Sequence, residues 1–351
     1  MIFLGDIAHP WDDTPHWADG KPPWENQPVV VNLEGTLVGN AAPMGHRRLF
    51  NKPSILDALK KYNVQVLSLA NNHAMDWPDQ FEDALQNLKE QGFVTVGAGM
   101  DSEEAAQSVE IEENGRRIFF LAFGWETIEC EAATTRKPGV NSLKPGPMLD
   151  SIRALRSRES EAVIAILPHW NYEMEVYPQP AHRQLAFAAI EAGADAVIGH
   201  HPHRVGGIEF HRGKLIAYSI GNFWLPQGAF FDGELRFAGD ACLELAIEWR
   251  PDAPAMAHWF RYSPADHSLS HMASEPLTDS LELKKRSGFA GLGHDEYKVW
   301  FRANRVKRKL LPIYDNYQNV MGNRMRDRYV LLRHKGLVAL ERSGLRRLMG
   351  L

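Results

Sequence analysis

Three histidines, His200, His201 and His203, lie within four positions directly behind an apolar run at 194–198. The run predicts a buried strand, so the imidazoles would lie at the rim of a sheet, where they can converge on one ligand. Histidine is the commonest metal ligand among the side chains. The cluster therefore indicates a metal site or a catalytic site; a solvated turn that is rich in histidine is the alternative.

Polar residues that chemistry commonly uses also follow five other apolar runs. Such short, nearly continuous runs predict strands that are covered on both faces. Because open α/β sheets bind ligands beyond the carboxyl ends of their strands, these residues are expected to share one site. They are Asp6 after 2–4, Asn32 and Glu34 after 29–31, Asn72 and His73 after 64–70, His169 after 162–168, and Asn222 after 215–220.

The size and composition of the chain allow one large α/β domain with an appendage, or two modest domains. It has 351 residues, of which 44% are hydrophobic. No apolar run approaches the roughly 18 residues of a membrane span, and the first residues lead into a predicted strand instead of a signal peptide. With only Cys130 and Cys242, a disulfide framework is not expected. These features predict a cytoplasmic protein.

Predicted strands and helices alternate up to about residue 250. A Pro-rich segment at 250–254 predicts a boundary between a domain at 1–250 and a region at 251–351. The second region is expected to hold a strand and loop excursion followed by a basic helical extension. The predicted helices are 54–62, 78–91, 150–158, 181–192, 296–311, 314–332 and 337–348, the last two broken at Gly336, and a hairpin joins 107–111 to 118–122.

Six phrases stand in one order along the chain: Gly5-Asp6, Asn32-Leu33-Glu34-Gly35, Ala70-Asn71-Asn72-His73, His169-Trp170 with Glu173, Gly199-His200-His201-Pro202-His203, and Tyr218-Ser219-Ile220-Gly221-Asn222-Phe223. Together they resemble the bacterial capsule synthesis family, known as CapA or as the poly-γ-glutamate synthesis protein PgsA. That family is similar to the calcineurin-like metallophosphoesterases. The resemblance covers roughly residues 1–250 and implies an α/β fold, a layered αββα sandwich.

The resemblance also implies a centre that holds two divalent metal ions. Oxygen and imidazole ligands without a thiolate suit Mn, Fe or Zn. The implied ligands are Asp6 and His203 for the first metal, Asn72, His169 and His201 for the second, and Glu34 as the bridging carboxylate.

Two positions depart from the metallophosphoesterase pattern. Ala8 stands where that pattern has a histidine, and His9 follows one residue late, so His9 would have to reach the first metal from a bulge. Glu34 replaces the shorter bridging aspartate. The second metal position is therefore the more secure of the two. His200 is expected to be a neighbour of the ligands and not one of them.

Five further residues are candidates for catalysis or substrate binding. His73 would protonate the leaving group, and Glu173 is either an acid/base or a solvated loop acid. Arg48, Tyr218 and Asn222 are candidates for binding an anionic or glutamyl-type substrate. The alternatives are a solvated basic loop for Arg48 and a loop-shaping role for the other two.

The implied function is that of a metal-dependent hydrolase, in which a bridging hydroxide attacks a phosphoester or a γ-glutamyl-type amide. The ligand set does not distinguish these two bonds. Two alternatives stay open. One is a non-catalytic metal-binding component of capsule or polyglutamate assembly, and the other is a phosphodiesterase or nucleotidase of the wider superfamily.

Basic residues are concentrated at the end of the chain, although the net charge is −5. From residue 298 onward there are 14 lysines and arginines against 3 acids. This region could make peripheral contact with an anionic membrane surface, or hold an acidic polymer such as polyglutamate. Packing against the acidic main domain, in cis or across a dimer, is preferred. Nucleic-acid binding is not expected because no recognition motif accompanies the charge, and the oligomeric state is left open.

Overall fold

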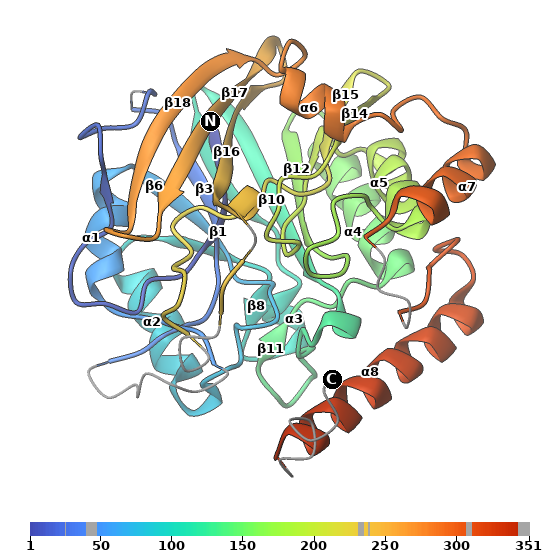
Figure 1. Cartoon of the computed structure of the whole chain (residues 1–351), viewed down its shortest axis with the longest axis horizontal. Helices are drawn as coiled ribbons and strands as arrows, with labels where there is room; N and C mark the ends of the chain where they lie inside the picture. Colours follow the sequence, from blue (N-terminus) through green and yellow to red (C-terminus); the bar gives the residue numbers. More distant parts are fainter. Residues whose placement is uncertain (25, 40–47, 231–234, 238, 307–310, 343–351) are drawn as a thin grey trace.

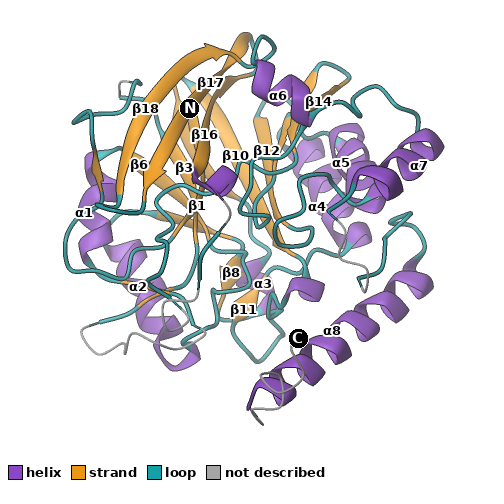
Figure 2. Ribbon diagram, in the orientation of Figure 1, coloured by secondary structure: helices purple, strands orange, loops and turns teal. Residues whose placement is uncertain are grey.

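The computed structural model shows two β-sheets packed face to face, with helices on their outer faces (Figures 1 and 2). It describes the chain except for residues 25, 40–47, 231–234, 238, 307–310 and 343–351, and gives only the backbone of 339–342. The α/β class and the αββα layering that the sequence predicts are confirmed.

The first sheet has eight strands, with β1 (Ile2–Ile7) in its middle. On one side it continues through parallel strands and on the other through antiparallel ones. The parallel strands are β3 (Val29–Leu33), β6 (Val64–Ser68) and β7 (Val94–Val96). The antiparallel strands are β16 (Leu243–Arg250), β17 (Ala253–Ser263) and β18 (Ser268–Pro276), with the short β2 (His16–Trp17) at the edge.

The second sheet has six strands, and four of them run parallel to one another. These are β10 (Arg116–Gly124), β12 (Val163–His169), β13 (Ala196–Ile198) and β15 (Lys214–Ala217). The predicted hairpin is present as β9 (Val109–Glu113) and β10, and β14 (Ile208–His211) closes the other edge. Two small sheets pair β4 (Thr36–Leu37) with β5 (Phe50–Asn51), and β8 (Ala98–Gly99) with β11 (Gly139–Val140).

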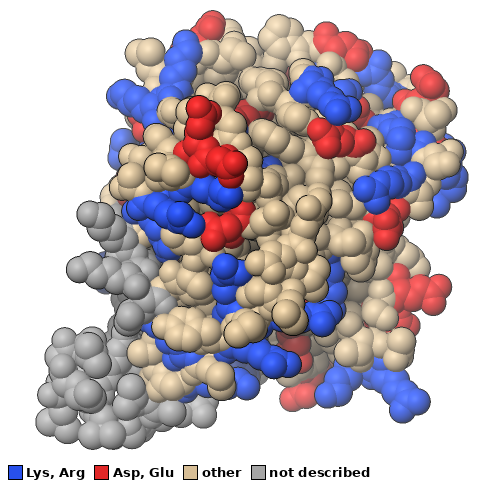
Figure 3. Space-filling view, turned by 90° about the vertical axis from the view of Figure 1, so that its right-hand side faces the viewer, with Lys and Arg blue, Asp and Glu red and all other residues tan. Residues whose placement is uncertain are grey.

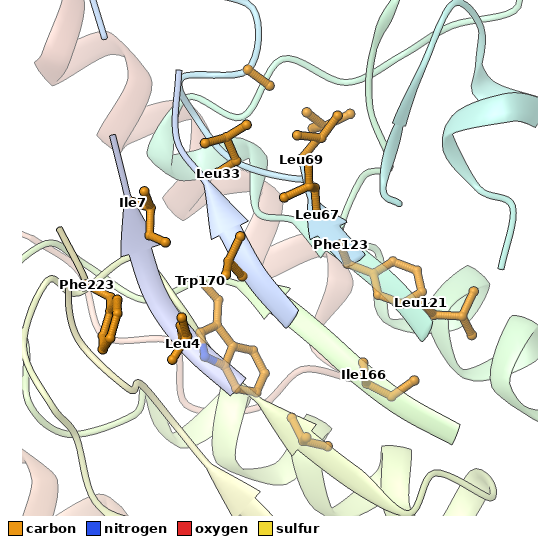
Figure 4. Packing of buried hydrophobic residues seen from close by; sticks show 14 of the residues in the cluster. Leu4, Ile7, Leu33, Leu67, Leu69, Leu121, Phe123, Ile166, Trp170 and Phe223 are labelled. Atoms are coloured by element: carbon orange, nitrogen blue, oxygen red, sulfur yellow. The ribbon is translucent and has the colours of Figure 1, made fainter. Parts of the chain in front are cut away.

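The central strands are buried on both faces, as their continuous apolar runs predict. Between the sheets, the rings of Phe3 and Phe120 meet edge to face, with centroids 6.5 Å apart. On the outer faces, residues such as Leu67 and Ile166 belong to a second buried cluster (Figure 4). This cluster lies under α1 (Ser54–Lys61) and α2 (Phe81–Glu90) on one side, and under α4 (Pro145–Arg158) and α5 (Pro180–Ala192) on the other.

The predicted helices of the first 250 residues are present with adjusted ends. The helix predicted at 78–91 begins with the 3-10 turn η1 (Pro78–Gln80) before α2. α4 begins at Pro145 instead of at 150, because proline suits the first turn of a helix, where its missing N–H has no partner to lose. A short helix that was not predicted, α3 (Ser102–Ala105), follows Asp101. The side chain of Asp101 accepts hydrogen bonds from two backbone N–H groups of this helix.

The sheet continues past the boundary that the sequence predicts near residue 250. Residues 251–252 form a tight turn between β16 and β17, and β18 adds a further strand. Two helices follow, α6 (Leu281–Arg286) and α7 (His294–Asn304). Arg183 of α5 forms a bidentate ion pair with buried Glu209 and donates to the carbonyl of Leu292, just before α7. The chain up to α7 therefore shares one core with residues 1–250.

The last helix, α8 (Val320–Arg342), runs unbroken through Gly336, where the sequence predicts two helices. One side of it docks beside the 3-10 turn η2 (Glu126–Ile128). There Asp327 accepts hydrogen bonds from the hydroxyls of Thr127 (2.7 Å) and Tyr314 (2.8 Å), and Val330 is buried. Within the part of the chain that the structure describes, no helix is long and apolar enough to cross a membrane.

Replacing Gly5 by alanine should lower the stability of the fold. A Cβ at this position would lie 2.1 Å from the carbonyl oxygen of Gly221, so β1 would have to move away from the loop that it packs against. Overpacking of this kind costs about 1–3 kcal/mol. Urea unfolding should show that loss for Gly5→Ala. The matched control is Gly146→Ala in α4, where no atom lies within 4 Å of the added Cβ; equal stability of the two variants would contradict the expectation.

Candidate metal centre

The predicted ligands lie together at the edge of the sandwich where the parallel strands end. Each comes from the end of a strand or from the loop behind it, and all except Asn72 are buried. Parallel strands of one sheet end at the same edge, which explains the convergence. The residues are Asp6 on β1, Glu34 behind β3, Asn72 behind β6, His169 at the end of β12, and His201 and His203 behind β13.

Glu34 lies between the other ligands, and its carboxylate has no hydrogen-bond donor. Neither oxygen is exposed, and neither accepts a hydrogen bond from a described residue. Its Oε1 lies 3.3 Å from Nε2 of His169. A buried carboxylate is costly unless a cation or a set of donors accompanies it. Glu34 is therefore a group that a bound cation would satisfy.

Glu34 belongs to two groups of residues whose possible ligand atoms lie within 4.8 Å of one another. His169 and His201 complete one group, and Asp6 and His203 complete the other. Asn72 lies beside the first of these groups, with its Oδ1 2.8 Å from Nε2 of His169. Two sets of oxygen and imidazole donors that share one carboxylate fit a divalent metal centre. The number and identity of the ions, and each ligand's role, stay predictions.

Burial shifts the pKa values of these candidate ligands in the directions that favour their neutral forms. It raises the pKa of Asp6 to about 6, against the opposing effects of His203 and Asn32. Burial, together with the charge of Asp6, holds the pKa of Glu34 well above its usual range. Burial and the neighbouring His201 hold the pKa of His169 well below its usual range. His169 is therefore neutral, which is the form that binds a metal.

Asn32 connects the two groups of candidate ligands; the sequence placed it among the residues of the shared site but gave it no role there. Its Nδ2 donates to Oδ1 of Asp6 at 2.8 Å and lies 3.4 Å from Nδ1 of His169. Hydrogen bonds of this kind fix the orientation of metal ligands. The available signal was its place two residues before Glu34 at the end of the same strand.

The loop behind β13 has an unusual backbone, and its three histidines make different contacts. His201 and His203 have φ values of 98° and 56°, in the region that favours glycine. The backbone N–H of His201 donates to Oδ2 of Asp6 at 3.2 Å, which ties the loop to β1. His200 takes no part in either ligand group, and its Nε2 lies 3.3 Å from the carbonyl oxygen of Leu4.

His73 is paired with Asp76, a residue that the sequence analysis did not single out. Nδ1 of His73 lies 2.8 Å from Oδ2 of Asp76, and both side chains are about one-sixth exposed. Asp76 also accepts the backbone N–H of Leu49 at 2.6 Å, which fixes its position. An acid three residues after a candidate catalytic histidine was the available signal. The pair leaves Nε2 of His73 as the ring nitrogen that can exchange a proton with a ligand.

His9 does not take the place of the ligand that is missing at Ala8. Nε2 of His9 lies 2.5 Å from the backbone carbonyl of Asp13, and its ring packs edge-on against Trp11. Ala8 is buried in a small apolar cluster with Phe50 and other residues. Position 8 is therefore used for packing, and His9 is directed into its own loop.

Tyr218 and Asn222 are both buried, which does not fit the substrate-binding role predicted for them. The hydroxyl of Tyr218 donates to Glu209 at 2.7 Å inside the second sheet, and its carbonyl accepts from Nε1 of Trp170. Tyr218 is thus part of the framework. Oδ1 of Asn222 lies 2.9 Å from Nδ1 of His203, so Asn222 is a buried neighbour of a candidate ligand and does not lie at the surface.

Glu173 and Arg48 are both exposed. The charge of Glu173 contributes to the raised pKa of Glu34, so Glu173 lies within electrostatic reach of the ligands. The guanidinium carbon of Arg48 lies 5.5 Å from the centroid of the Trp77 ring, beside Asp76 in the chain. Their roles as acid/base and substrate ligand stay predictions.

Comparison with known families finds one match that covers most of the two-sheet core. The model of the bacterial capsule synthesis protein PGA_cap family matches residues 4–227. The chain is 36% identical over 180 residues to the PGA biosynthesis protein CapA of Bacillus subtilis, over 51% of this chain and 47% of that one. It is 32% identical over 204 residues to the capsule biosynthesis protein CapA of Bacillus anthracis, over 55% and 50%. The chain thus spans about half the length of these curated relatives.

The matches among solved structures are weaker. One is a 5'-nucleotidase precursor from Thermus thermophilus, which is 10% identical to this chain. The aligned part includes 72% of this chain and 45% of the nucleotidase, with a TM-score of 0.37. Similarity at this level says nothing about activity.

Divalent metal binding should weaken as the pH falls and should release protons near neutral pH. The raised pKa values of Asp6 and Glu34 mean that protons compete with a cation for both carboxylates, and at Asp6 that competition grows below about pH 6. Calorimetric titration with Mn²⁺ should show an affinity about tenfold or more lower at pH 5.5 than at pH 7.5. In Glu34→Gln, one competing proton is removed and the pH dependence should flatten; affinity that is independent of pH in the unmodified protein would contradict this account.

Two neighbouring histidines should respond differently to the same substitution. His201→Gln should lower the bound metal, because it removes an imidazole from one ligand group. His200→Gln should retain it, because His200 belongs to neither ligand group and its ring nitrogen Nε2 lies against the backbone carbonyl of Leu4. Elemental analysis of the purified variants measures this, and loss of metal from His200→Gln alone would show that the two histidines are assigned the wrong way round.

Proposed function

The chain belongs to the bacterial capsule synthesis protein PGA_cap family, and on that premise we propose that it is a metal-dependent hydrolase of a phosphoester or a γ-glutamyl-type amide. The observation that carries the proposal is the buried carboxylate of Glu34, which accepts no hydrogen bond from a described residue and is shared by two groups of candidate ligands. A purely structural acid would be given hydrogen-bond donors at this depth.

In this proposal the centre holds two divalent ions, Mn, Fe or Zn. Bound there, the ions would polarise the oxygen of the scissile bond and lower the pKa of a coordinated water. Glu34 would hold both ions. Asp6 and His203 would hold the first, with Asn222 beside them, and Asn72, His169 and His201 would hold the second.

The protein's own proton chemistry is assigned to His73. Its Nδ1 is held by Asp76, so Nε2 can deliver a proton to the leaving group, and the Asp76 carboxylate stabilises the imidazolium form. Glu173 is a second acid/base candidate at the exposed side of the centre. Arg48 would contact an anionic part of the substrate, where a guanidinium can form paired hydrogen bonds with a carboxylate or a phosphate.

The names of the relatives favour an anionic or glutamyl-type substrate. Two of them are named for PGA and capsule biosynthesis, and a Mycobacterium tuberculosis relative is named as a probable polyglutamine synthesis accessory protein. The same names also favour one competing function, a non-catalytic metal-binding role in assembly of such a polymer. The two functions differ in one measurable respect, because only the hydrolase turns over a small substrate.

The His73→Gln variant should lose turnover while retaining its metal. Loss of a general acid typically costs about 10²–10⁴-fold in rate. Hydrolysis of p-nitrophenyl phosphate, bis-p-nitrophenyl phosphate and γ-glutamyl-p-nitroanilide by the Mn²⁺-loaded protein, with elemental analysis of the same samples, measures both properties. Asp76→Asn should lower kcat less than His73→Gln does, because it acts only through the orientation and charge of His73.

The matched control is His211→Gln, which changes a histidine that pairs with Glu191 away from the centre. It should leave kcat unchanged. Full activity in His73→Gln would remove His73 from the mechanism. Stoichiometric metal without turnover of any of the three substrates would favour the assembly role.

A further inference from the structure

The outward side of α8 carries an apolar stripe with nothing packed on it in the described part of the chain. It consists of Met321, Met325, Tyr329 and Leu332, which recur at four, four and three residues and so share one face of the helix. Met321 is 78% and Leu332 69% exposed, unusual values for residues of this kind. The opposite side, with Asp327 and Val330, is the one that docks on the protein.

Basic side chains border this stripe along both of its sides. By helical position, Arg324, Arg328 and Lys335 lie along one side, and Arg326 and Arg333 lie along the other. The one acid among the described side chains of α8 is Asp327, and it is turned toward Thr127 and Tyr314. Figure 3 views this side of the molecule, and Lys and Arg side chains are spread over the whole of it, its lower part included.

We propose that the outward face of α8 binds the surface of an anionic lipid bilayer. An apolar stripe bordered by arginine and lysine is the pattern of helices that lie in the membrane interface, with the apolar side chains among the acyl chains and the cations at the headgroups. The docked side keeps α8 attached to the body through Asp327 and Val330. The protein binds as a folded unit, with the helix parallel to the membrane.

Two other occupants fit the face less well. A second copy of the chain would bring one row of cations against another without a facing acid, and like charges repel. An acidic polymer would satisfy the cations but would leave Met321, Met325 and Leu332 in water. Only an anionic bilayer matches both the charge and the apolar stripe.

The placement of α8 gives this contact a consequence for the metal centre. The helix docks on η2, which directly follows β10, and the end of β10 is paired with His169 at the end of β12. α8 thus lies at the same edge of the sheets as the predicted ligands. Membrane binding through α8 would hold the centre close to the bilayer surface. The membrane contact itself does not depend on the proposed hydrolase activity.

Vesicle co-sedimentation of the full chain tests the proposal. The vesicles are phosphatidylcholine alone and phosphatidylcholine mixed with phosphatidylglycerol, and the protein should sediment with the anionic ones. Arg324→Gln with Arg328→Gln should weaken that binding roughly 30-fold at low salt. Met325→Ser with Leu332→Ser should abolish it, because the charges alone do not hold the helix in the interface.

Each double variant has a matched control elsewhere on the surface. Arg136→Gln with Lys137→Gln removes two exposed cations from a turn, and Met272→Ser with Leu281→Ser removes an exposed methionine and leucine. Both controls should bind vesicles like the unmodified protein. All four variants change exposed side chains, so their thermal unfolding midpoints should match, which separates loss of binding from loss of folding.

Three results would overturn the proposal. The first is equal sedimentation with neutral and anionic vesicles. The second is a dimer, seen by analytical ultracentrifugation, that Met325→Ser with Leu332→Ser converts to a monomer. The third is binding of soluble poly-γ-glutamate, with no vesicle binding, that is lost on removal of the arginines and kept on removal of the apolar side chains.

Discussion

The constraint on which the site depends is the buried carboxylate of Glu34 at the rim of the two sheets, to which no described residue donates a hydrogen bond. Glu34 is an anion only at a cost unless cations lie beside it, and burial raises its pKa accordingly. The other ligands surround it because several parallel strands end at the same edge, each with a polar residue just past its apolar run. The packing of the two sheets therefore also brings ionisable side chains together in a buried place.

The geometry at this edge is set by close backbone contacts as well as by side chains. A Cβ on Gly199 would lie 2.2 Å from the carbonyl oxygen of Tyr218, so the start of the histidine loop rests directly on the neighbouring chain. Below it, the ion pair of Arg183 with Glu209 also receives the hydroxyl of Tyr218. Tyr218, which the sequence predicted to bind substrate, thus belongs to the framework that supports the site.

The α/β class and the convergence of polar residues at the strand ends could be predicted from local patterns, whereas the αββα layering and the proposed ligand set came from the family resemblance. Apolar runs followed by Asp6, Glu34, His169 and the histidine cluster mark strand ends whatever the details of packing. Roles that depend on which way a side chain turns could not be predicted. His9 faces its own loop, and Asp76 reaches back to His73, and neither direction is encoded in spacing along the chain. The boundary predicted near residue 250 is a turn within the first sheet. A Pro-rich sequence does not distinguish a turn within a sheet from a linker between domains.

The central place of β1 has a consequence for how the protein is made. The first strand lies between β3, which follows it closely, and β16, whose residues Ile247 and Glu248 pair with Phe3 and Ile2 from the far part of the chain. On the ribosome, the edge of β1 that pairs with β16 stays open until β16 has emerged. Contacts of such long sequence separation slow folding and leave strand edges exposed to other chains in the meantime. The strand that carries Asp6 is thus synthesised long before β16 and is enclosed on that side only after it.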